Sequence, residues 1–260
     1  MDKILEILKK NNLTNCDITP IGHHQLDRNY VYWIKGDEEY ILKVYQKEIK
    51  YLCEKRGLKT FEANPMIPQM IDYGEKEFFW ILSKKIKGYI LEEIWPDLNL
   101  HLQKKTVELL GELLGGIHKK KKDTYFGGWV DMPQRPIFYD FIEYRKQNDH
   151  RILTRIKNQS LPDQELFNKA FDTLKNYYKY LNPQSISSIT HRDFSYRNML
   201  VEKNNNQIIL KGLIDFEHCQ MDDPCIDFNP LYQYNMLYNK ELEEIFFKTY
   251  KKKYEFTGRL

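Results

Sequence analysis

Residues 190–200 read Thr-His-Arg-Asp-Phe-Ser-Tyr-Arg-Asn-Met-Leu, and residues 212–217 read Gly-Leu-Ile-Asp-Phe-Glu. The two segments place Asp193, then Asn198 five residues later, then Asp215 at the end of a short apolar run. The stretch between them predicts a strand, a polar turn and a second strand. Each residue alone is commonplace, since an Asp after two apolar residues is an ordinary strand end. The information lies in the ordered set joined by a short hairpin.

The spacing suits the transfer of a phosphoryl group. That reaction spreads charge over the phosphoryl oxygens, so catalysis is mostly positioning and charge neutralisation. Asp193 follows the strand-like residues Ile186–Ile189 on a short loop, where its carboxylate can accept a hydroxyl proton. The loop can curl to bring the amide oxygen of Asn198 towards Asp215, and Mg²⁺ prefers a few oxygen ligands together with nucleotide phosphates. We therefore expect a magnesium site between the two loops.

These two segments resemble the catalytic loop and the metal-binding loop of the aminoglycoside phosphotransferase and choline kinase-like superfamily. The resemblance implies an α+β, bilobal protein-kinase-like fold, with a small antiparallel-sheet N-lobe and a mostly helical C-lobe. It also implies that Asp193 is the catalytic base, that His191 braces its loop, and that Asn198 and Asp215 bind Mg²⁺. Glu217 departs from the glycine of protein kinases and is similar to small-molecule kinases, so it is expected to contact a metal directly or through water. A solvated loop acid is the alternative interpretation of Glu217.

The first third of the chain carries a candidate nucleotide-binding lysine. Residues Asn29–Tyr45 are rich in β-branched and aromatic residues around a Lys-Gly-Asp turn, which predicts a hairpin. Lys43 lies among apolar neighbours in its second strand, and burial there is costly unless the ammonium meets an anion. The resemblance implies that phosphates of ATP or GTP supply the anion and that Glu48, on the helix-like stretch Lys47–Lys55, orients the lysine. Glu54 is the second candidate partner, and an outward-facing strand lysine is the plain alternative.

Two further segments are assigned to the nucleotide. Residues 20–30 contain a single glycine, Gly22, and lack the glycine-rich motif of protein kinases. Gly22 is expected to belong to the phosphate-covering loop, or simply to serve a turn, and His23 and His24 are interpreted as exposed loop residues. The polar connector Ser83–Gly88 resembles the hinge whose backbone bonds the purine, which makes Ser83 and Lys85 candidate contacts.

The pattern divides the chain into two lobes. Residues 1–83 are predicted to form the N-terminal nucleotide-binding lobe, residues 84–88 the hinge, and residues 89–260 the C-terminal catalytic and acceptor-binding lobe. The first lobe contains strand-like runs at Ile71–Gly74 and Phe78–Leu82. Helical periodicity in the second lobe covers residues 102–118, 138–146, 164–180 and 240–251.

Two residues of the second lobe are expected to support the catalytic loop or the fold. Asp227 is similar in position to the family aspartate that steadies the catalytic loop, and a helix N-cap is its alternative role. His118 closes a helix as in the family, and we interpret it as structural.

Composition limits the possible partners. The net charge of +3 is too small to indicate nucleic acid, and the run Lys119–Lys122 is interpreted as a solvated helix end. Four cysteines without Cys-x-x-Cys spacing argue against zinc and suit reduced thiols in the cytoplasm. No apolar run approaches ~18 residues, and residues 1–10 have the pattern of an amphipathic surface helix, not of a signal peptide. We expect a cytoplasmic monomer or homodimer with no membrane partner.

The acceptor is expected to bind in the second lobe near Asp193, where acids and aromatic residues together would suit a cationic amine. Ordinary helix surfaces and cores contain the same residue types, which is the alternative interpretation. The candidates are Asp140, Glu143, Asp222, Asp223, Glu241, Glu243, Glu244, Phe138, Tyr139, Tyr144, Tyr232, Tyr234 and Tyr238.

The favoured function is an ATP- or GTP-dependent, Mg²⁺-requiring kinase of a small hydroxylated molecule. An aminoglycoside-like antibiotic or another aminated metabolite is the expected acceptor, which would make the chain an antibiotic-resistance enzyme. A choline/ethanolamine- or sugar-type metabolic kinase is the second hypothesis, and an inactive kinase-fold binding module the third. Joint retention of Lys43, Asp193, Asn198 and Asp215 argues against the third. A protein substrate is disfavoured, because helix-like sequence begins by Asp227 and leaves no room for a long activation segment after Asp215.

Overall fold

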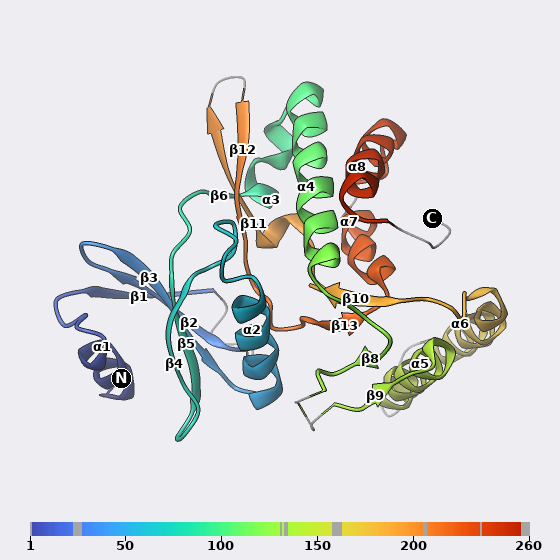
Figure 1. Ribbon diagram of the computed structural model, residues 1–260, viewed down its shortest axis with the longest axis horizontal. Helices are drawn as coiled ribbons and strands as arrows, with labels where there is room; N and C mark the ends of the chain where they lie inside the picture. The colour runs from blue at the N-terminus through green and yellow to red at the C-terminus, as the bar shows by residue number, and fades with distance from the viewer. Residues whose placement is uncertain are drawn as a thin grey trace.

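The computed structural model describes residues 2–22, 28–130, 132, 135–157, 163–204, 207–234 and 236–255. Its elements are α1 (Asp2–Lys10), β1 (Asp17–Ile21), β2 (Tyr30–Lys35), β3 (Glu39–Tyr45), α2 (Glu48–Thr60), β4 (Met70–Gly74), β5 (Phe79–Lys84), β6 (Tyr89–Ile90), α3 (Leu91–Ile94), η1 (Trp95–Asp97), α4 (Leu100–Lys120), β7 (Lys122–Asp123), β8 (Phe126–Gly127), β9 (Ile137–Phe138), α5 (Phe141–Lys157), α6 (Gln164–Tyr177), η2 (Tyr178–Tyr180), β10 (Ser187–Thr190), η3 (Tyr196–Asn198), β11 (Met199–Asn204), β12 (Gln207–Leu213), β13 (Gln220–Asp222), η4 (Pro224–Phe228), α7 (Asn229–Gln233) and α8 (Lys240–Lys253). Figure 1 shows the strands β1 to β5 on one side of the molecule and the long helices α4 and α8 on the other.

The N-terminal sheet is antiparallel, in the order β1-β2-β3-β5-β4. The predicted hairpin over residues 29–45 is confirmed as β2 and β3, with Val31 opposite Lys43. The two predicted strands near residues 71–82 are confirmed as β4 and β5. This part of the chain therefore matches the expected antiparallel-sheet lobe.

The two faces of this sheet meet different helices. Ile4, Ile7 and Leu8 of α1 pack with Leu42 and other residues on one face. Because successive side chains of a strand point to opposite faces, Lys43 and Tyr45 face the other way. There Tyr45 packs with residues of α2 in the main hydrophobic core. The alternation along β3 thus turns Lys43 towards α2.

The second part of the molecule is mostly helical, as predicted. The periodicity of residues 102–118 is confirmed as α4, which begins after its N-cap Asn99 and packs against α8 (Figure 1). The helix expected at residues 138–146 instead begins at Phe141 and continues to Lys157. Asp140 accepts a hydrogen bond from the backbone of Glu143 at 2.6 Å, which is the interaction of a helix-capping side chain. Ile137 and Phe138, which precede it, form β9.

Short strands carry the loops of the site. β10 precedes the catalytic loop, and the predicted hairpin of residues 201–210 is confirmed as β11 and β12. β6, just after the connector, pairs with β11. Gly88 has φ 151°, and a Cβ there would lie 2.9 Å from the carbonyl oxygen of Val201, so the connector approaches β11 more closely than a larger residue allows. The lobe boundaries at residues 83 and 88 stay predictions.

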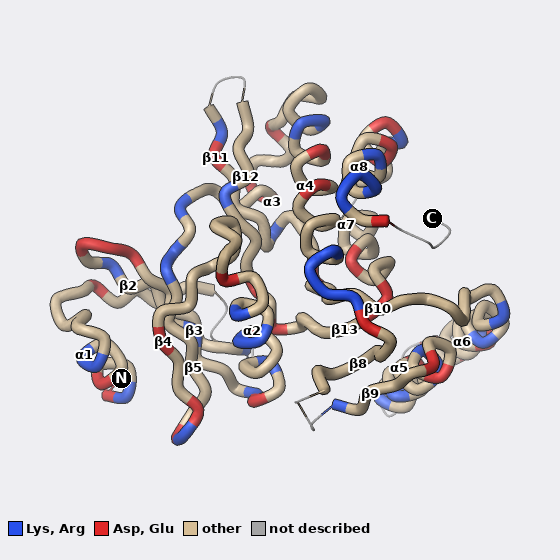
Figure 2. Tube along the Cα trace, in the orientation of Figure 1, with Lys and Arg blue, Asp and Glu red and all other residues tan. Residues whose placement is uncertain are grey.

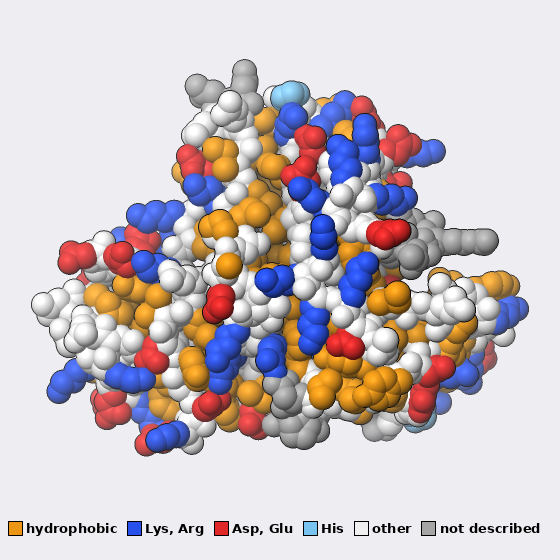
Figure 3. Space-filling model, viewed as in Figure 1, with side chains coloured by type: hydrophobic (Ala, Val, Ile, Leu, Met, Phe, Trp, Pro, Cys, Tyr) orange, Lys and Arg blue, Asp and Glu red, His pale blue; other side chains and the backbone are white. Residues whose placement is uncertain are grey.

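The lysine run at the end of α4 is a solvated helix terminus, as predicted. Lys119, Lys120 and Lys122 are exposed, and Figure 2 shows the run as a continuous blue segment leaving α4. On the same face in the space-filling view, basic side chains are interspersed with apolar and uncharged ones (Figure 3). None of the helices in the described part of the chain has the length and apolar character needed to span a bilayer.

Candidate active site

Lys43 lies at the centre of a group of carboxylates. Its ammonium nitrogen lies 2.6 Å from Asp215 Oδ1, 2.7 Å from Glu54 Oε2 and 3.1 Å from Glu217 Oε2. The lysine side chain is only 14% exposed. The structure therefore brings together a strand, a helix and the loop after β12, and the outward-facing interpretation of Lys43 is wrong.

The electrostatics of this group favour the charged lysine. Burial alone would lower the pKa of Lys43, but Asp215, Glu54 and Glu217 outweigh it and raise that pKa. Burial also acts to raise the pKa of Asp215, yet Lys43 holds it below its usual value. For Glu54 burial prevails and raises the pKa. A buried ammonium thus keeps Asp215 ionised at the point where a metal ligand is predicted.

The expected pairing of Lys43 with Glu48 is wrong. Glu48 is the first residue of α2 and is exposed, whereas Glu54, the second candidate, is 7% exposed and pairs with the lysine. Six residues along an α-helix correspond to about 600°, so the two glutamates point in different directions. Only one of them can face β3.

Close packing sets the position of α2. Gly57 lies one turn beyond Glu54, and a Cβ on it would lie 2.9 Å from Cδ1 of the buried Phe216. Phe216 belongs to the loop that carries Asp215. The absence of a side chain at Gly57 lets α2 pack directly on this loop, the predicted metal-binding loop.

The catalytic loop is held by Asp227. The carboxylate of Asp227 accepts hydrogen bonds from the backbone amides of His191, at 2.8 Å, and Arg192. Arg192 has φ 64°, an uncommon conformation for a residue with a side chain, and such conformations persist when surrounding contacts hold them. The N-cap of η4 is Asp223, so the N-cap interpretation of Asp227 is wrong for this helix.

His191 connects the catalytic and metal-binding loops. It is fully buried, and its Nε2 lies 3.0 Å from the carbonyl oxygen of Ile214. A carbonyl only accepts, so Nε2 carries the proton and Nδ1 is free to accept the 3.3 Å contact from the backbone of Asp193. The ring also packs on Phe216, with centroids 4.6 Å apart. These contacts tie the two loops together, and the bracing role that the resemblance implies stays a prediction.

Asn198 is placed beside both loops. Its Nδ2 donates to the carbonyl oxygen of Asp193 at 2.9 Å, and its own carbonyl accepts from the backbone of Ile214. Among the described residues, no donor meets its Oδ1. The side-chain amide is thereby oriented with an oxygen to spare, while Asp215, with φ 70°, presents its carboxylate from the adjacent loop.

The oxygens of this region fit a divalent cation. Ligand atoms of Glu54, Asp215 and Glu217 lie within 4.8 Å of one another. Lys43 and Lys50 balance two of these three carboxylates. The remaining negative charge and the oxygen of Asn198 suit the hard oxygen coordination of Mg²⁺.

Glu217 is buried, so its interpretation as a solvated loop acid is wrong. It is 8% exposed and accepts from Lys50, Asn29 and Lys43. These donors contact both carboxylate oxygens, so Glu217 is held in place by three partners. Asn29 and Lys50 are contacts that the sequence analysis missed, and no local pattern in the sequence marks either one.

Arg197 was also missed, and it contacts the predicted base. Its guanidinium donates to both oxygens of Asp193, at 2.9 and 2.8 Å, and to the hydroxyl of Tyr234. The spacing of four residues after Asp193 is the signal that could have found it. The arginine side chain is 46% exposed, so this pair faces the solvent side of the loop.

The structure gives mixed outcomes for the remaining nucleotide candidates. Gly22 follows β1 with φ 81°, whereas His23 and His24 lie outside the described residues. Ser83 is buried within β5. Lys85 donates its backbone amide to the carbonyl oxygen of Glu39 and its ammonium to the Glu39 carboxylate, so neither group is available to a purine without rearrangement.

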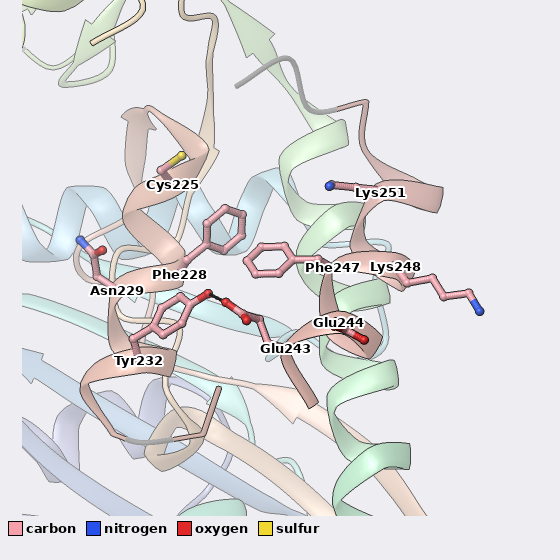
Figure 4. Close-up of a pocket in the computed structure, with 9 residues that line it drawn as sticks. All are labelled: Cys225, Phe228, Asn229, Tyr232, Glu243, Glu244, Phe247, Lys248 and Lys251. Carbon is pink, nitrogen blue, oxygen red and sulfur yellow. Dashed lines mark hydrogen bonds between the residues drawn. The ribbon is translucent and has the colours of Figure 1, made fainter. Parts of the chain in front are cut away.

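Most of the acidic residues proposed to bind the acceptor already pair with other side chains or with the backbone of this protein. Asp222 is buried and paired with Arg192, Glu241 pairs with Lys104, and Glu243 accepts from Tyr232. The cavity between η4, α7 and α8, drawn in Figure 4, is lined by that Tyr232–Glu243 pair, apolar rings and lysines. It contains none of the predicted catalytic or metal-binding residues.

Comparisons with known proteins agree with this fold. The model of the phosphotransferase enzyme family matches residues 17–259. The GDP and kanamycin complex of the aminoglycoside phosphotransferase APH(2")-IIia has a TM-score of 0.68 at 17% identity, over 94% of this chain and 82% of that chain. A thermostable mutant of aminoglycoside phosphotransferase APH(4)-Ia with ADP and hygromycin B gives 0.67 at 15% identity, over 92% and 79%. Plasmodium vivax ethanolamine kinase gives 0.63 at 16%, over 95% and 70%. No curated protein matches the sequence.

The predicted bilobal, protein-kinase-like fold is thereby confirmed, and with it the class of protein: a small-molecule kinase. The family match covers most of the sequence, and the predicted resemblance is correct. The chain belongs to the phosphotransferase enzyme family.

Proposed function

We propose that the chain transfers the γ-phosphate of ATP or GTP to a hydroxyl of a small aminated acceptor, with Asp193 as the base. The observation that carries the proposal is the convergence of Lys43, Glu54 and Asp215 beside the loop of Asp193. Similar structures hold GDP, ADP and AMP-PNP, which supports a nucleotide co-substrate.

Each residue has a distinct role in this proposal. Lys43 contacts the α- and β-phosphates, and Glu54 keeps its ammonium in place. Asp215 and Asn198 would hold Mg²⁺, which when bound neutralises phosphate charge. Glu217 contributes indirectly, because its contacts with Lys50 and Asn29 tie the metal-binding loop to the nucleotide-binding lobe.

Arg197 orients the carboxylate of Asp193 by donating to both of its oxygens. Each carboxylate oxygen has a second lone pair, so the acceptor hydroxyl donates its proton to one of them while the guanidinium keeps the carboxylate in place.

An aminated acceptor is supported by the surroundings of the catalytic loop. The ring of Tyr196 contacts Trp95 and Tyr234, with centroids 6.2 and 5.8 Å away. Burial raises the pKa of Tyr196, and the charge of Glu92 adds to that rise. Aromatic faces with a nearby acid attract ammonium groups. Relatives crystallised with kanamycin and hygromycin B favour an aminoglycoside-like antibiotic as the acceptor. The function would then be antibiotic resistance in the cytoplasm. The similarity to an ethanolamine kinase supports a choline/ethanolamine-type acceptor as the alternative.

The test is a nucleotide-turnover screen. ADP or GDP release is measured with Mg²⁺ and either ATP or GTP, against aminoglycosides, choline, ethanolamine, amino acids and sugars. Asp193→Asn is expected to lower turnover by orders of magnitude while calorimetry still detects nucleotide binding. Retained turnover in Asp193→Asn would refute the base, and unchanged Mg²⁺-dependent nucleotide affinity in Asp215→Ala would refute the metal ligand. Absence of both turnover and nucleotide binding would favour the binding-module hypothesis.

A further inference from the structure

A second cavity lies beside the catalytic loop and is lined by three arginines. Its volume is about 310 Å³, and Arg135, Arg151 and Arg192 reach it from the segment before β9, from α5 and from the catalytic loop. Gln220 and Tyr144 complete the part of the wall used here. This volume is at the lower end of the range for small-molecule sites.

The positive charge of this cavity is only partly balanced within the protein. Arg192 pairs with the buried Asp222 at 3.2 Å. The partners of Arg135 and Arg151 among the described residues are amide oxygens, those of Gln220 and Asn148. None of the described residues that line the cavity is acidic. Three guanidinium groups therefore face one space with a single carboxylate behind them.

The guanidinium groups of Arg135, Arg151 and Arg192 determine which ligand chemistry suits the cavity. Guanidinium groups match the planar, bidentate geometry of carboxylate and phosphate oxygens.

We propose that this cavity is a binding site for a small phosphate-bearing anion, separate from the nucleotide. Arg135 and Arg151 contact the phosphate oxygens. Arg192 links the bound anion to the catalytic loop. That residue precedes Asp193, and its backbone amide is held by Asp227. The ligand is either free phosphate or a phosphorylated metabolite, and the site does not depend on which acceptor the enzyme uses.

The experiment is isothermal titration calorimetry of the full chain with inorganic phosphate and, separately, glucose 6-phosphate. Saturating AMP-PNP and Mg²⁺ are present so that phosphate does not enter the nucleotide site. Arg135→Gln and Arg151→Gln remove one charge each without touching the catalytic loop. Arg155→Gln is the matched control, because Arg155 is also exposed on α5 but does not line the cavity.

We expect saturable binding that each cavity variant weakens by about tenfold or more, as for the loss of a charge-assisted contact. Arg155→Gln is expected to bind as the unmodified chain does. Tighter binding of inorganic phosphate supports the free anion, and tighter binding of glucose 6-phosphate supports a phosphorylated metabolite. No saturable heat with either ligand, or equal weakening by Arg155→Gln, overturns the proposal. Circular dichroism of each variant establishes that it is folded. Failure of AMP-PNP to bind would count against the proposed kinase function alone. The Arg135 and Arg151 variants would still show whether phosphate binds in this cavity or in the nucleotide site.

Discussion

His118 and Asp227 are separated by 109 residues in the sequence, and their side chains meet at 3.0 Å in the fully buried core. His118 is held on its other ring nitrogen by the hydroxyl of Tyr250, at 2.8 Å. Asp227 in turn accepts from the amides of His191 and Arg192. A chain of hydrogen bonds therefore runs from α8 through α4 to the catalytic loop, and the loop conformation depends on helices far from it in sequence.

Asp227→Ala is expected to lower the free energy of unfolding by about 2–5 kcal/mol, because it leaves two backbone amides of the catalytic loop and the buried His118 without their acceptor. Turnover is expected to fall with it, since the backbone of Arg192 loses its support. Urea unfolding followed by circular dichroism gives the free energy. Asp223→Ala is the control, since the loss of a cap at η4 costs only about 1 kcal/mol. Equal losses in the two variants would contradict the bracing role.

Glu54→Gln and Glu48→Gln are expected to differ sharply. The first removes the charge that holds Lys43, so kcat/KM for the nucleotide should fall by about 10–100-fold, or about 1.4–2.7 kcal/mol of transition-state stabilisation. The second alters an exposed residue at the start of the same helix and should change kcat/KM by less than about twofold. Steady-state kinetics measures both. A larger effect at Glu48 would restore the pairing that the structure rejects.

Gly57→Ala is expected to destabilise the protein, although alanine favours helix by up to about 1 kcal/mol. The added Cβ would lie 2.9 Å from buried Phe216, and overpacking of this kind costs about 1–3 kcal/mol. Gly116→Ala on α4 meets nothing within 4 Å, so it should stabilise by up to about 1 kcal/mol. Urea unfolding should show changes in the free energy of unfolding of opposite sign for the two variants. Changes of the same sign would refute close contact between α2 and the metal-binding loop.

Arg197→Gln is expected to lower kcat by about tenfold or more while KM for the nucleotide changes little, because the arginine orients Asp193 rather than the phosphates. Arg197→Lys should recover only part of the loss, since an ammonium lacks the two-pronged geometry of the guanidinium. Initial rates at saturating acceptor measure kcat. An increase in kcat for Arg197→Gln would show that the arginine inhibits the base.

Asp72 should make the docking of α1 sensitive to acid. Burial alone would raise the pKa of Asp72, but hydrogen bonds from Lys10 and Asn11 outweigh it and lower that pKa. A carboxyl whose pKa is lowered on folding stabilises the protein above its unfolded value near 4 and ceases to do so as the pH falls through the folded value. Asp72→Asn should therefore lower the free energy of unfolding by up to about 1 kcal/mol near neutral pH. The difference in this free energy between the variant and the unmodified chain should narrow below about pH 4. Urea unfolding across pH checks this, with Glu77→Gln as the control variant, because Glu77 and its partner Lys3 are both exposed.

The sequence alone predicted several of the main elements and the order of the motifs. Alternation of residue type predicted the β2–β3 and β11–β12 hairpins, helical periodicity predicted α4 and α8, and Asp193 and Asp215 were found by local spacing. These patterns arise because strands and helices repeat over two and 3.6 residues, so nearby residues carry the signal.

Only the tertiary structure decided which side chains meet. Whether Glu48 or Glu54 faces Lys43 depends on the rotation of α2, and that is set by the contact of Gly57 with Phe216. Helical periodicity fixes angles between residues of one helix but not the angle of the helix to the sheet. Two further contacts join separate segments of the chain: Lys50 with Glu217, and His118 with Asp227. The contact of Arg197 with Asp193 depends on the conformation of a single loop. Their energies depend on distance and burial, which spacing along the chain does not determine.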